Sequence, residues 1–402
     1  MNKNLKIFTD NIEEKAAEQI NLLLEQEVFK NTKVRIMPDV HAGKGCVIGF
    51  TGNLGDKVIP NIVGVDIGCG MLTVNLGNIN LNLEKLDDII KNNVPSGFNI
   101  HDVKKEKFDK LPDLRCYRDL KDTKRFERSI GTLGGGNHFI EIDIDEDNNK
   151  YLVIHTGSRN LGKQVAEHYQ NMADQLCNYD MHEYNEKQQE LIKEYKELGR
   201  RKEIQKALEK LQKQYRTSKN IIPRDLAYLE KNHRDDYLHD MKICQDFAAL
   251  NRSMIAKLIC DNLGNISTQD SFETIHNYID LDSNIVRKGA ISAKKDELLL
   301  IPINMRDGCI IGKGKGNDDW NMSAPHGAGR IMSRTQAKKS FDLEEFKKSM
   351  EGIYTTSVNK DTLDEAPFVY KPIQEIIGNI KDTVEIIRII KPIYNFKAGD
   401  DK

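Results

Sequence analysis

The sequence has no run of about 18 apolar residues, the length that a helix needs to cross a bilayer, so we expect no membrane-spanning segment. None of its seven cysteines stands in a Cys-x-x-Cys pair, which excludes a zinc ribbon and a thioredoxin-type redox motif. Residues 1–15 carry acidic side chains where a signal peptide has an apolar stretch. We therefore expect a cytoplasmic protein whose cysteines are free thiols.

The charge balance also lacks an excess of either sign. The 402 residues include 60 Lys and Arg against 62 Asp and Glu, which gives a formal net charge of -2. A global basic excess, the simplest sequence indication of nucleic-acid binding, is therefore absent. A summed charge does not describe how the charge is distributed, so a local basic groove stays open.

Along the chain, Gly-rich segments alternate with amphipathic ones. Short β-branched runs cut by Gly, Pro and Asp, typical of strands and tight loops, occupy residues 34–76, 131–162 and 272–333. The motif-bearing loops come from both sides of a long helical region, which favours one domain with a helical insertion. Helices are expected over residues 11–28, 82–93, 163–260, 341–353 and 372–391, an irregular segment over 101–128, and an extended chain from 391 onward.

Residues 183–219 are dense in Glu, Lys and Gln and carry two apolar stripes on either side of Gly199. This pattern predicts two antiparallel helices. Two interpretations stay open, a substrate-contacting arm or a solvated hairpin with charge pairs four residues apart, and the charge pattern favours the hairpin. The stripes consist of Leu191, Tyr195 and Leu198, and of Ile204, Leu208, Leu211 and Tyr215.

Half of the ten histidines stand in Gly-rich loops or at predicted strand ends. Binding and catalytic sites are commonly built on loops that a rigid scaffold positions, so five such histidines together indicate a site. These five are His41, His138, His155, His276 and His326. The others lie in polar or charged stretches and are expected at the surface; they are His101, His168, His182, His233 and His239.

The segment VGVDIGCGM places Asp66 and Cys69 three residues apart among glycines. Glycines let the backbone turn so that both side chains can face one ion, and carboxylate, thiolate and neutral imidazole are all transition-metal ligands. Three imidazoles, one thiolate and one carboxylate exceed the needs of one tetrahedral ion, whereas a cysteine shared by two divalent ions uses them all. The alternative is a buried cysteine in a tight turn.

HGAGR at residues 326–330 combines a histidine, a small flexible loop and an arginine. Backbone N–H groups of such a loop can hold a phosphate, Arg330 can add charge, and His326 can act as a nucleophile toward phosphorus; the alternative is an ordinary turn. GKGKGNDDW at 312–320 is either a phosphate loop or a flexible connection. GTLGGGNHF matches neither a P-loop nor a dinucleotide fingerprint.

Taken in order, these segments resemble the RtcB family of RNA ligases, which join a 3′-phosphate or 2′,3′-cyclic phosphate end of RNA to a 5′-hydroxyl end. The matching strings run from residue 37 to 399, and DVHxGxG, VDIGCG, GNHFIE and HGAGR in this order are highly specific. The strings are MPDVHAGKG, VGVDIGCGM, GTLGGGNHFIEI, IHTGSRNLG, LNRSM, HNYI, RKGA, SAPHGAGRIMSR and NFKAG.

The resemblance implies a single α+β domain over residues 1–402, with sheets and helices around a deep metal cleft and the hairpin at 183–219 inserted in it. It implies GTP and two Mn²⁺ ions as cofactors, although thiolate and imidazole bind Zn²⁺ more tightly, so zinc could occupy the site. The implied partner is RNA with a 3′-phosphate or 2′,3′-cyclic phosphate end and a 5′-hydroxyl end. An activating protein partner is left open.

Residue roles follow from the matching strings. Asp66, Cys69, His138, His155 and His276 match the metal ligands, with Cys69 bridging two ions. His326 matches the guanylylated histidine, and Glu141 an acidic residue near the nucleotide and the metals. Nucleotide contacts are implied for Asn137, for Asn304 and Arg306, for the loop of His326, Gly327, Ala328, Gly329 and Arg330, and for Lys397, which would hold guanine. Arg159 and Lys288 are further candidates for RNA or nucleotide contacts.

Two departures from the family pattern bear on the nucleotide site. Many members have a Pro-Gly-Ser-Met-Gly turn where this chain has Pro302-Ile303-Asn304-Met305-Arg306, so Asn304 or Arg306 must make different contacts there. The tail, usually Lys-Gly, is Lys397-Ala398-Gly399 followed by three residues. These features suggest a divergent branch used in RNA repair rather than in tRNA splicing.

The expected reaction has three steps: GMP transfer from GTP to His326, GMP transfer to the RNA 3′-phosphate, and attack by the 5′-hydroxyl. Two other classes stay open, a metal-dependent hydrolase of RNA-end phosphates and a non-catalytic RNA-end-binding protein. His326 and Lys397 argue against both, because neither class needs a nucleophile or a guanine anchor.

Overall fold

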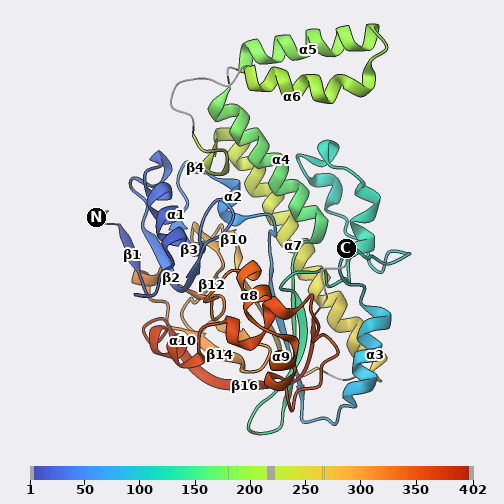
Figure 1. Cartoon of the computed structure of the whole chain (residues 1–402), viewed down its shortest axis with the longest axis vertical. Coiled ribbons are helices and arrows are strands. Elements are labelled where there is room, and N and C mark those ends of the chain that lie inside the picture. Colours follow the sequence, from blue (N-terminus) through green and yellow to red (C-terminus); the bar gives the residue numbers. More distant parts are fainter. Residues whose placement is uncertain (1–3, 180, 215–221, 265, 267, 398–402) are drawn as a thin grey trace.

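The computed structural model describes residues 4–179, 181–214, 222–264, 266 and 268–397 and has an α+β fold, as the sequence predicts (Figure 1). Two larger sheets lie beside two long helices, and a helical hairpin stands at one end of the molecule. Within the part of the chain described, no helix is both long enough and apolar enough to cross a membrane.

The larger sheet has seven strands, and every neighbouring pair is antiparallel. Its two edge strands approach each other, since the backbone N–H of Leu300 donates to Thr274 Oγ1 at 3.1 Å. The sheet is therefore curved almost into a barrel. Its order is β13 (Leu298–Asn304), β14 (Gly308–Gly314), β16 (Val384–Lys397), β6 (Phe139–Ile144), β7 (Lys150–Thr156), β5 (Gly70–Gly77) and β9 (Ser271–Ile275).

Side chains of these strands alternate between the two faces of the sheet. Ile140 and Ile154 belong to the face that packs with Ile255 and Ile259 of helix α7. Residues of the opposite parity therefore face the interior of the curve, where the predicted site residues Glu141 and His155 are found.

The second sheet carries the DVHAGKG segment. The only parallel pair among its described strands is β1 with β2. The order is β1 (Leu5–Ile7), β2 (Val34–His41), β3 (Ile48–Asn53), β11 (Ile285–Lys288) and β10 (Asn277–Asp280). Two short ladders pair β4 (Lys57–Val58) with β8 (Leu229–Glu230) and β12 (Ala290–Ser292) with β15 (Ser323–Pro325).

Helices α4 and α7 run side by side and form the long axis of the molecule (Figure 1). The main core lies between them and the smaller sheet, with Tyr169, Tyr237 and Phe247 fully buried. The helices are α1 (Glu14–Leu24), α2 (Pro60–Val63), α3 (Leu83–Asn93), α4 (Arg159–Asn178), α5 (Met181–Glu197), α6 (Ile204–Gln214), α7 (Lys231–Asn262), α8 (Arg334–Ser340), α9 (Leu343–Ser349) and α10 (Ile373–Asn379).

Helices α5 and α6 lie antiparallel at the end of the molecule, away from both larger sheets (Figure 1). Gly199, with a φ of +70°, lies in the turn between them. Residues 215–219 of the predicted hairpin lie outside the described residues.

Three expectations from the sequence are wrong. The helical region expected over 163–260 is interrupted by the strand β8, which pairs with β4. Residues 372–391 are helical only over α10, and from Val384 the chain is the strand β16, which pairs with β14 and β6. His101, expected at the surface, is buried, and its Nε2 lies 3.1 Å from the Gly131 carbonyl oxygen. In each case, contacts with residues far away in the sequence decide the structure, which the local sequence pattern does not indicate.

Candidate functional site

Strand register brings the predicted metal ligands together. The residue after His138 and the second residue after Cys69 both pair with His155 on β7, the strand between β6 and β5. The backbone N–H of His276 donates to the Cys69 carbonyl oxygen at 2.9 Å. Gly68 has a φ of +73°, and a Cβ there would lie 2.9 Å from the Cα of Gln245, so only glycine fits this turn before Cys69.

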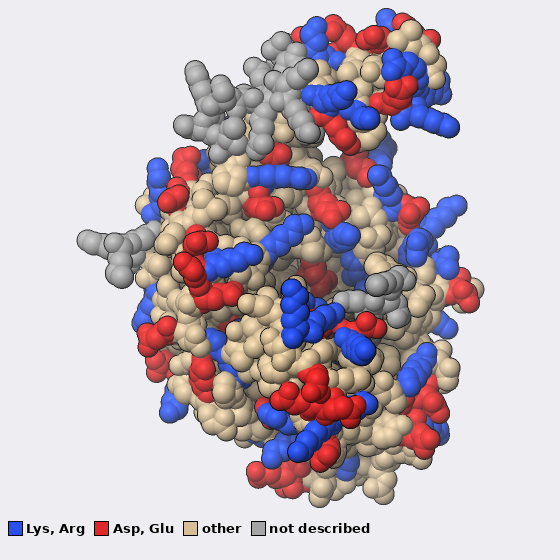
Figure 2. Space-filling view, in the orientation of Figure 1, with Lys and Arg blue, Asp and Glu red and all other residues tan. Residues whose placement is uncertain are grey.

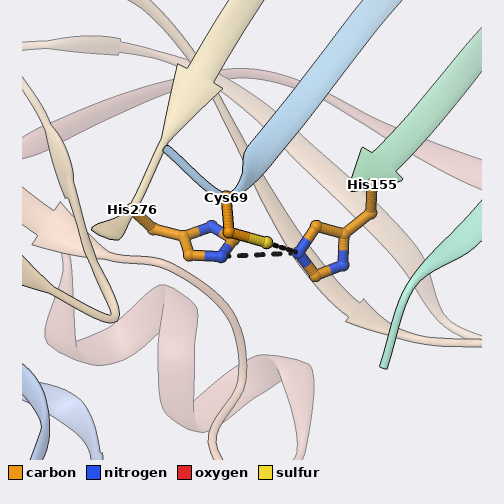
Figure 3. Close-up of side chains that lie close together, drawn as sticks. All are labelled: Cys69, His155 and His276. Atoms are coloured by element: carbon orange, nitrogen blue, oxygen red, sulfur yellow. Dashed lines mark hydrogen bonds between the residues drawn. The ribbon is translucent and has the colours of Figure 1, made fainter. Parts of the chain in front are cut away.

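Cys69 lies at the centre of the cluster. Its Sγ is 3.3 Å from His155 Nε2, and the Nε2 atoms of His155 and His276 are 3.4 Å apart (Figure 3). Cys69 Sγ also lies 3.4 Å from His138 Nε2. Asp66 Oδ2 lies 3.0 Å from His138 Nε2. Two groups capable of holding a cation therefore share the cysteine: Cys69, His155 and His276 form one, and Asp66, Cys69 and His138 form the other.

Backbone carbonyls orient two of the three imidazoles. His138 Nδ1 lies 3.0 Å from the Leu133 carbonyl oxygen, and His155 Nδ1 lies 3.2 Å from that of Asn137. A carbonyl acceptor keeps the ring proton on Nδ1 and leaves the Nε2 lone pair for a metal. The donor set and its orientation therefore fit a transition metal better than a tight turn with a buried cysteine.

Burial sets the protonation of the cluster. It lowers the pKa of His155 and His276 well below the usual value, so both rings are neutral and able to coordinate at neutral pH. Burial, reinforced by the Asp66 carboxylate, raises the pKa of the Cys69 thiol well above its usual value. Burial also opposes ionisation of Asp66, but its contacts with His138 and Cys69 outweigh burial and lower its pKa to about 2.

Two residues of α7 in the LNRSM string hold the metal-binding loops in place, a role that the sequence did not reveal. Arg252 is fully buried, and its Nη1 donates to the carbonyl oxygens of Gly68 at 2.8 Å and Thr156 at 2.9 Å. Asn251 Oδ1 accepts from the backbone N–H groups of Gly131 and Thr132. These two side chains tie together the loops that precede β5 and β6 and the end of β7.

His326 follows β15 and lies beside the metal cluster, with its ring centroid 4.9 Å from that of His276. Its Nδ1 is 2.6 Å from Oδ2 of Asp39, which also accepts the His326 backbone N–H at 3.0 Å. Asp39 is fully buried on β2. This carboxylate keeps the proton on Nδ1 and leaves the Nε2 lone pair available. Asp39 was missed as a functional residue, although it is part of the DVHAGKG string.

A cavity opens beside His326, and most of the predicted nucleotide-binding residues line it. At one end, Lys397 Nζ lies 2.5 Å from Glu365 Oε2. Burial opposes ionisation of Glu365, but Lys397 and two arginines lower its pKa to about 2. The predicted residues that line the cavity are Asn137, Glu141, His155, His276, Asn304, His326, Gly327, Ala328, Gly329, Arg330 and Lys397.

Several predicted contacts have other partners. Arg306 does not line the cavity; its Nε donates to Asp307 Oδ1 at 2.8 Å, outside it. Arg330 lines the cavity, but its Nη1 lies 3.2 Å from Glu365 Oε1. Lys288 is buried, and its Nζ donates to the carbonyl oxygens of Lys44 and Asn61, so it supports the DVHAGKG loop. Arg159 binds the Gly97 carbonyl oxygen at 2.9 Å.

Glu141 also lines the cavity and is buried. Asn395 donates to its Oε2, and Cys309 Sγ lies 3.8 Å from its Oε1. Burial raises the pKa of Glu141 and, more strongly, that of the neighbouring Asp143. Burial therefore favours the protonated forms of these two neighbouring carboxyl groups, of which Glu141 lines the cavity.

Lys and Arg side chains surround a hollow near the middle of the face shown, next to α8 (Figure 2). Asp and Glu side chains also lie near this hollow, but Lys and Arg are prominent around it although the whole chain is close to neutral. Such focusing raises the local concentration of anions. The surface around the hollow favours a phosphate-bearing ligand.

Comparison with known proteins shows which proteins this chain is similar to. The family model described as tRNA-splicing ligase RtcB matches residues 26–119 and 112–398. The chain is 29% identical over 440 residues to the RNA-splicing ligase RtcB of Escherichia coli (strain K12), covering 99% of this chain and 98% of the relative. It is 25% identical to the tRNA-splicing ligase RtcB of Nanoarchaeum equitans (strain Kin4-M), covering 94% and 91%.

Proposed function

The chain belongs to the tRNA-splicing ligase RtcB family, and from this premise we propose that it is an RNA ligase acting in RNA repair or tRNA splicing. One observation carries the proposal: His326, oriented by a buried carboxylate, lies beside a cluster of metal ligands in a cavity that also contains Lys397. We further propose that residues 1–402 form one ligase domain, with the hairpin 183–219 as an insertion.

We assign two divalent cations, Mn²⁺ in the working enzyme, to the two groups that share Cys69. One would be held by Cys69, His155 and His276, and the other by Asp66, Cys69 and His138. When bound, such cations neutralise phosphate charge and orient an in-line displacement. The same donors bind Zn²⁺ more tightly, so zinc can replace manganese during purification.

His326 acts first. Its Nε2 attacks the α-phosphorus of GTP, an N–P bond forms, the bond to the bridging oxygen breaks, and pyrophosphate leaves. The buried Asp39 carboxylate stabilises the positive charge that develops on the imidazole. Lys397 and Asn137, in the same cavity, are proposed to hold the guanine and the rest of the nucleotide.

The RNA 3′-phosphate then takes GMP from His326 and becomes an activated diphosphate linkage. The 5′-hydroxyl of the second strand attacks the RNA phosphorus, and GMP leaves. A 2′,3′-cyclic phosphate is first opened by water to a 3′-phosphate. Glu141, which lines the same cavity, is proposed as an acidic residue that lies close to the bound nucleotide and the metals.

Incubation with GTP labelled at the α-phosphate and Mn²⁺ tests the first step. We expect a protein adduct that is labile to acid and stable to alkali, as a phosphoramidate is. His326→Ala should abolish it, and His233→Ala, which alters an exposed histidine of α7, should retain it. Labelling that persists in His326→Ala, or that maps to a lysine, would exclude the proposed nucleophile.

The ends that are joined are tested with label in the 3′-terminal phosphate of one strand. We expect that phosphate in a nuclease-resistant junction, with a 5′-hydroxyl strand as acceptor and GTP consumed. A requirement for a 5′-phosphate would contradict the proposal. Label released as inorganic phosphate without joining would favour a hydrolase.

A further inference from the structure

A third group of side chains capable of holding a cation lies on the interior face of the curved sheet, apart from the two groups already assigned. It consists of Glu141 and Asp143 on β6 and Cys309 on β14, and one ligand atom of each lies within 4.8 Å of the other two. Strand β16 lies between them, since Glu141 pairs with Asn395 and Cys309 pairs with Ile390. The group therefore joins the strands on either side of β16.

The spacing of this third group is close to that of tetrahedral coordination. Zinc bonds of about 2.3 Å to sulfur and about 2.0–2.2 Å to oxygen place two tetrahedral ligand atoms about 3.5 Å apart. Cys309 Sγ lies 3.8 Å from Glu141 Oε1. For comparison, Cys69 Sγ lies 3.3 Å and 3.4 Å from two imidazole nitrogens of the other groups. The third group needs only a small contraction to surround an ion.

Burial makes the ionised form of this group costly unless a cation is bound. Glu141, Asp143 and Cys309 are buried, and the side chains packed around Cys309 are hydrophobic. Neither carboxylate oxygen of Asp143 has a hydrogen-bond partner among the residues that the structure describes. Lys397, whose charge acts on Glu141, is itself paired with Glu365 at 2.5 Å. Buried carboxyl groups of this kind either keep a proton or bind a cation.

Asn395 is a separate indication of a ligand at this place. Its side chain is buried, and its Nδ2 donates to Glu141 Oε2. Within the described part of the chain, its Oδ1 has no hydrogen-bond partner. The two ends of an amide are nearly equal in size, so rotation of the amide would place this oxygen beside Glu141. It would then complete a set of four ligands with two carboxylates and one thiolate.

We propose that Glu141, Asp143, Cys309 and Asn395 form a zinc site that fastens β6, β14 and β16 together beside the His326 cavity. Thiolate and carboxylate are both zinc ligands, and the thiolate favours Zn²⁺ over Mg²⁺, Ca²⁺ and Mn²⁺. Glu141 and Asn395 line the cavity, so the ion reaches the site from there. The site is distinct from the two groups that share Cys69.

Binding of zinc exchanges protons for the ion. Burial raises the pKa of the Cys309 thiol and of Asp143 well above their usual values, and it also raises the pKa of Glu141. Zn²⁺ therefore displaces the thiol proton and the carboxyl protons, which pass to the solvent. The bound ion keeps both carboxylates ionised and fixes the Glu141 side chain at the cavity wall.

Cobalt absorption tests the site in a background that lacks the shared cysteine. With Co²⁺ added to Cys69→Ser, we expect the near-ultraviolet band of a cobalt–thiolate bond to remain. The band should disappear when Cys309→Ser is added to Cys69→Ser, and it should remain when Cys260→Ser is added instead, because Cys260 is a buried cysteine outside the three groups. No band in Cys69→Ser, or a band that survives Cys309→Ser, would overturn the proposal.

Counting bound ions provides a second test. After equilibrium dialysis against Zn²⁺, we expect Cys309→Ser and Asp143→Asn each to hold about one ion per chain fewer than the wild type, and Cys260→Ser to hold as many. The two substitutions lie on different strands and nearly keep the shape of the side chains, and circular dichroism identifies a variant that does not fold. Equal ion counts in the wild type and in either folded variant would exclude the site.

The zinc site and the proposed function are tested separately. The GMP adduct reports on His326, whereas the cobalt band and the difference in ion count report on Cys309 and Asp143. If the wild type forms no adduct but the variants lose one ion, the proposed function fails and the zinc site stands. If the adduct forms and the ion counts are equal, only the zinc site fails.

Discussion

The contact between Asp39 and His326 allows a quantitative test of the nucleophile through Asp39→Asn, which keeps the shape of the side chain and removes its charge. Asp39 Oδ2 accepts both the backbone N–H and Nδ1 of His326, at 3.0 Å and 2.6 Å. Oδ1 is buried and has no hydrogen-bond partner among the residues that the structure describes. The amide introduced by Asp39→Asn has one oxygen and one NH₂ group in place of the two carboxylate oxygens, so either a hydrogen bond to His326 is lost or a buried NH₂ group lacks an acceptor.

Of the two amide orientations, only one preserves the nucleophile. With its oxygen toward His326 both hydrogen bonds survive, and the buried NH₂ group lacks an acceptor, which costs about 1–3 kcal/mol of stability. The reverse orientation would place the ring proton on Nε2, which then cannot attack. We therefore expect the first orientation, and a slower reaction because the imidazole gains positive charge as its N–P bond forms. Loss of about 1–3 kcal/mol of charge-assisted stabilisation corresponds to roughly 5-fold to 150-fold.

The assay is single-turnover transfer of label from α-labelled GTP at saturating nucleotide, with the free energy of unfolding measured for the same proteins. Asp240→Asn is the matched control: Asp240 is fully buried and accepts from the backbone N–H groups of Arg115 and Cys116 and from the Tyr169 hydroxyl. This control should lose stability and keep the rate. Transfer at the wild-type rate in Asp39→Asn, or equal slowing in the control, would refute the reasoning.

Three further outcomes follow from the structure. Because burial raises the pKa of the Cys69 thiol, metal binding must displace the thiol proton. We therefore expect the affinity for Mn²⁺, measured by calorimetry, to rise with pH by up to about tenfold per pH unit and to fall as the pH drops. Cys69→Ser should remove both this pH dependence and GMP transfer. Arg252→Ala should lower the free energy of unfolding in urea by about 3–5 kcal/mol, because the fully buried Arg252 is paired with Glu273, whereas a loss below 1 kcal/mol would contradict its role. Replacing 183–219 by a short loop should leave GMP transfer and RNA affinity unchanged, because the described part of the hairpin lies away from both larger sheets; weaker RNA binding in a filter assay would show instead that the hairpin is a substrate arm.

The sequence pairs candidate residues that are close in the chain more readily than residues that are far apart. Asp66 and Cys69 are close in sequence and in space, so a Gly-rich turn was enough to pair them. Asp39 and His326 are separated by 287 residues. Their contact depends on how β2 and β15 are placed, which no local pattern specifies.

The secondary-structure prediction was wrong where one segment fits both a helical and a strand pattern. VEIIRIIK, the first part of β16, can be read as helical because its Ile residues recur with a spacing compatible with a helix, but Val and Ile also favour strands. Pairing on both sides, with β14 and β6, decides in favour of the strand. The pairing partner of Lys397 on β6 is Phe139, 258 residues away, so tertiary contacts decide the structure of this segment.

The altered turn at 302–306 shows how a departure from the family pattern is accommodated. Asn304 Oδ1 accepts the backbone N–H groups of Arg306 at 3.0 Å and Asp307 at 2.9 Å, and Asn304 Nδ2 donates to Asp307 at 2.8 Å. The polar side chain of Asn304 therefore makes its hydrogen bonds within the turn, and Arg306 pairs with Asp307 outside the cavity. Pro302, Ile303, Asn304 and Met305 still line the cavity. The substitutions therefore add no charge to the cavity wall, and we infer that the nucleotide meets this segment without a new ionic contact.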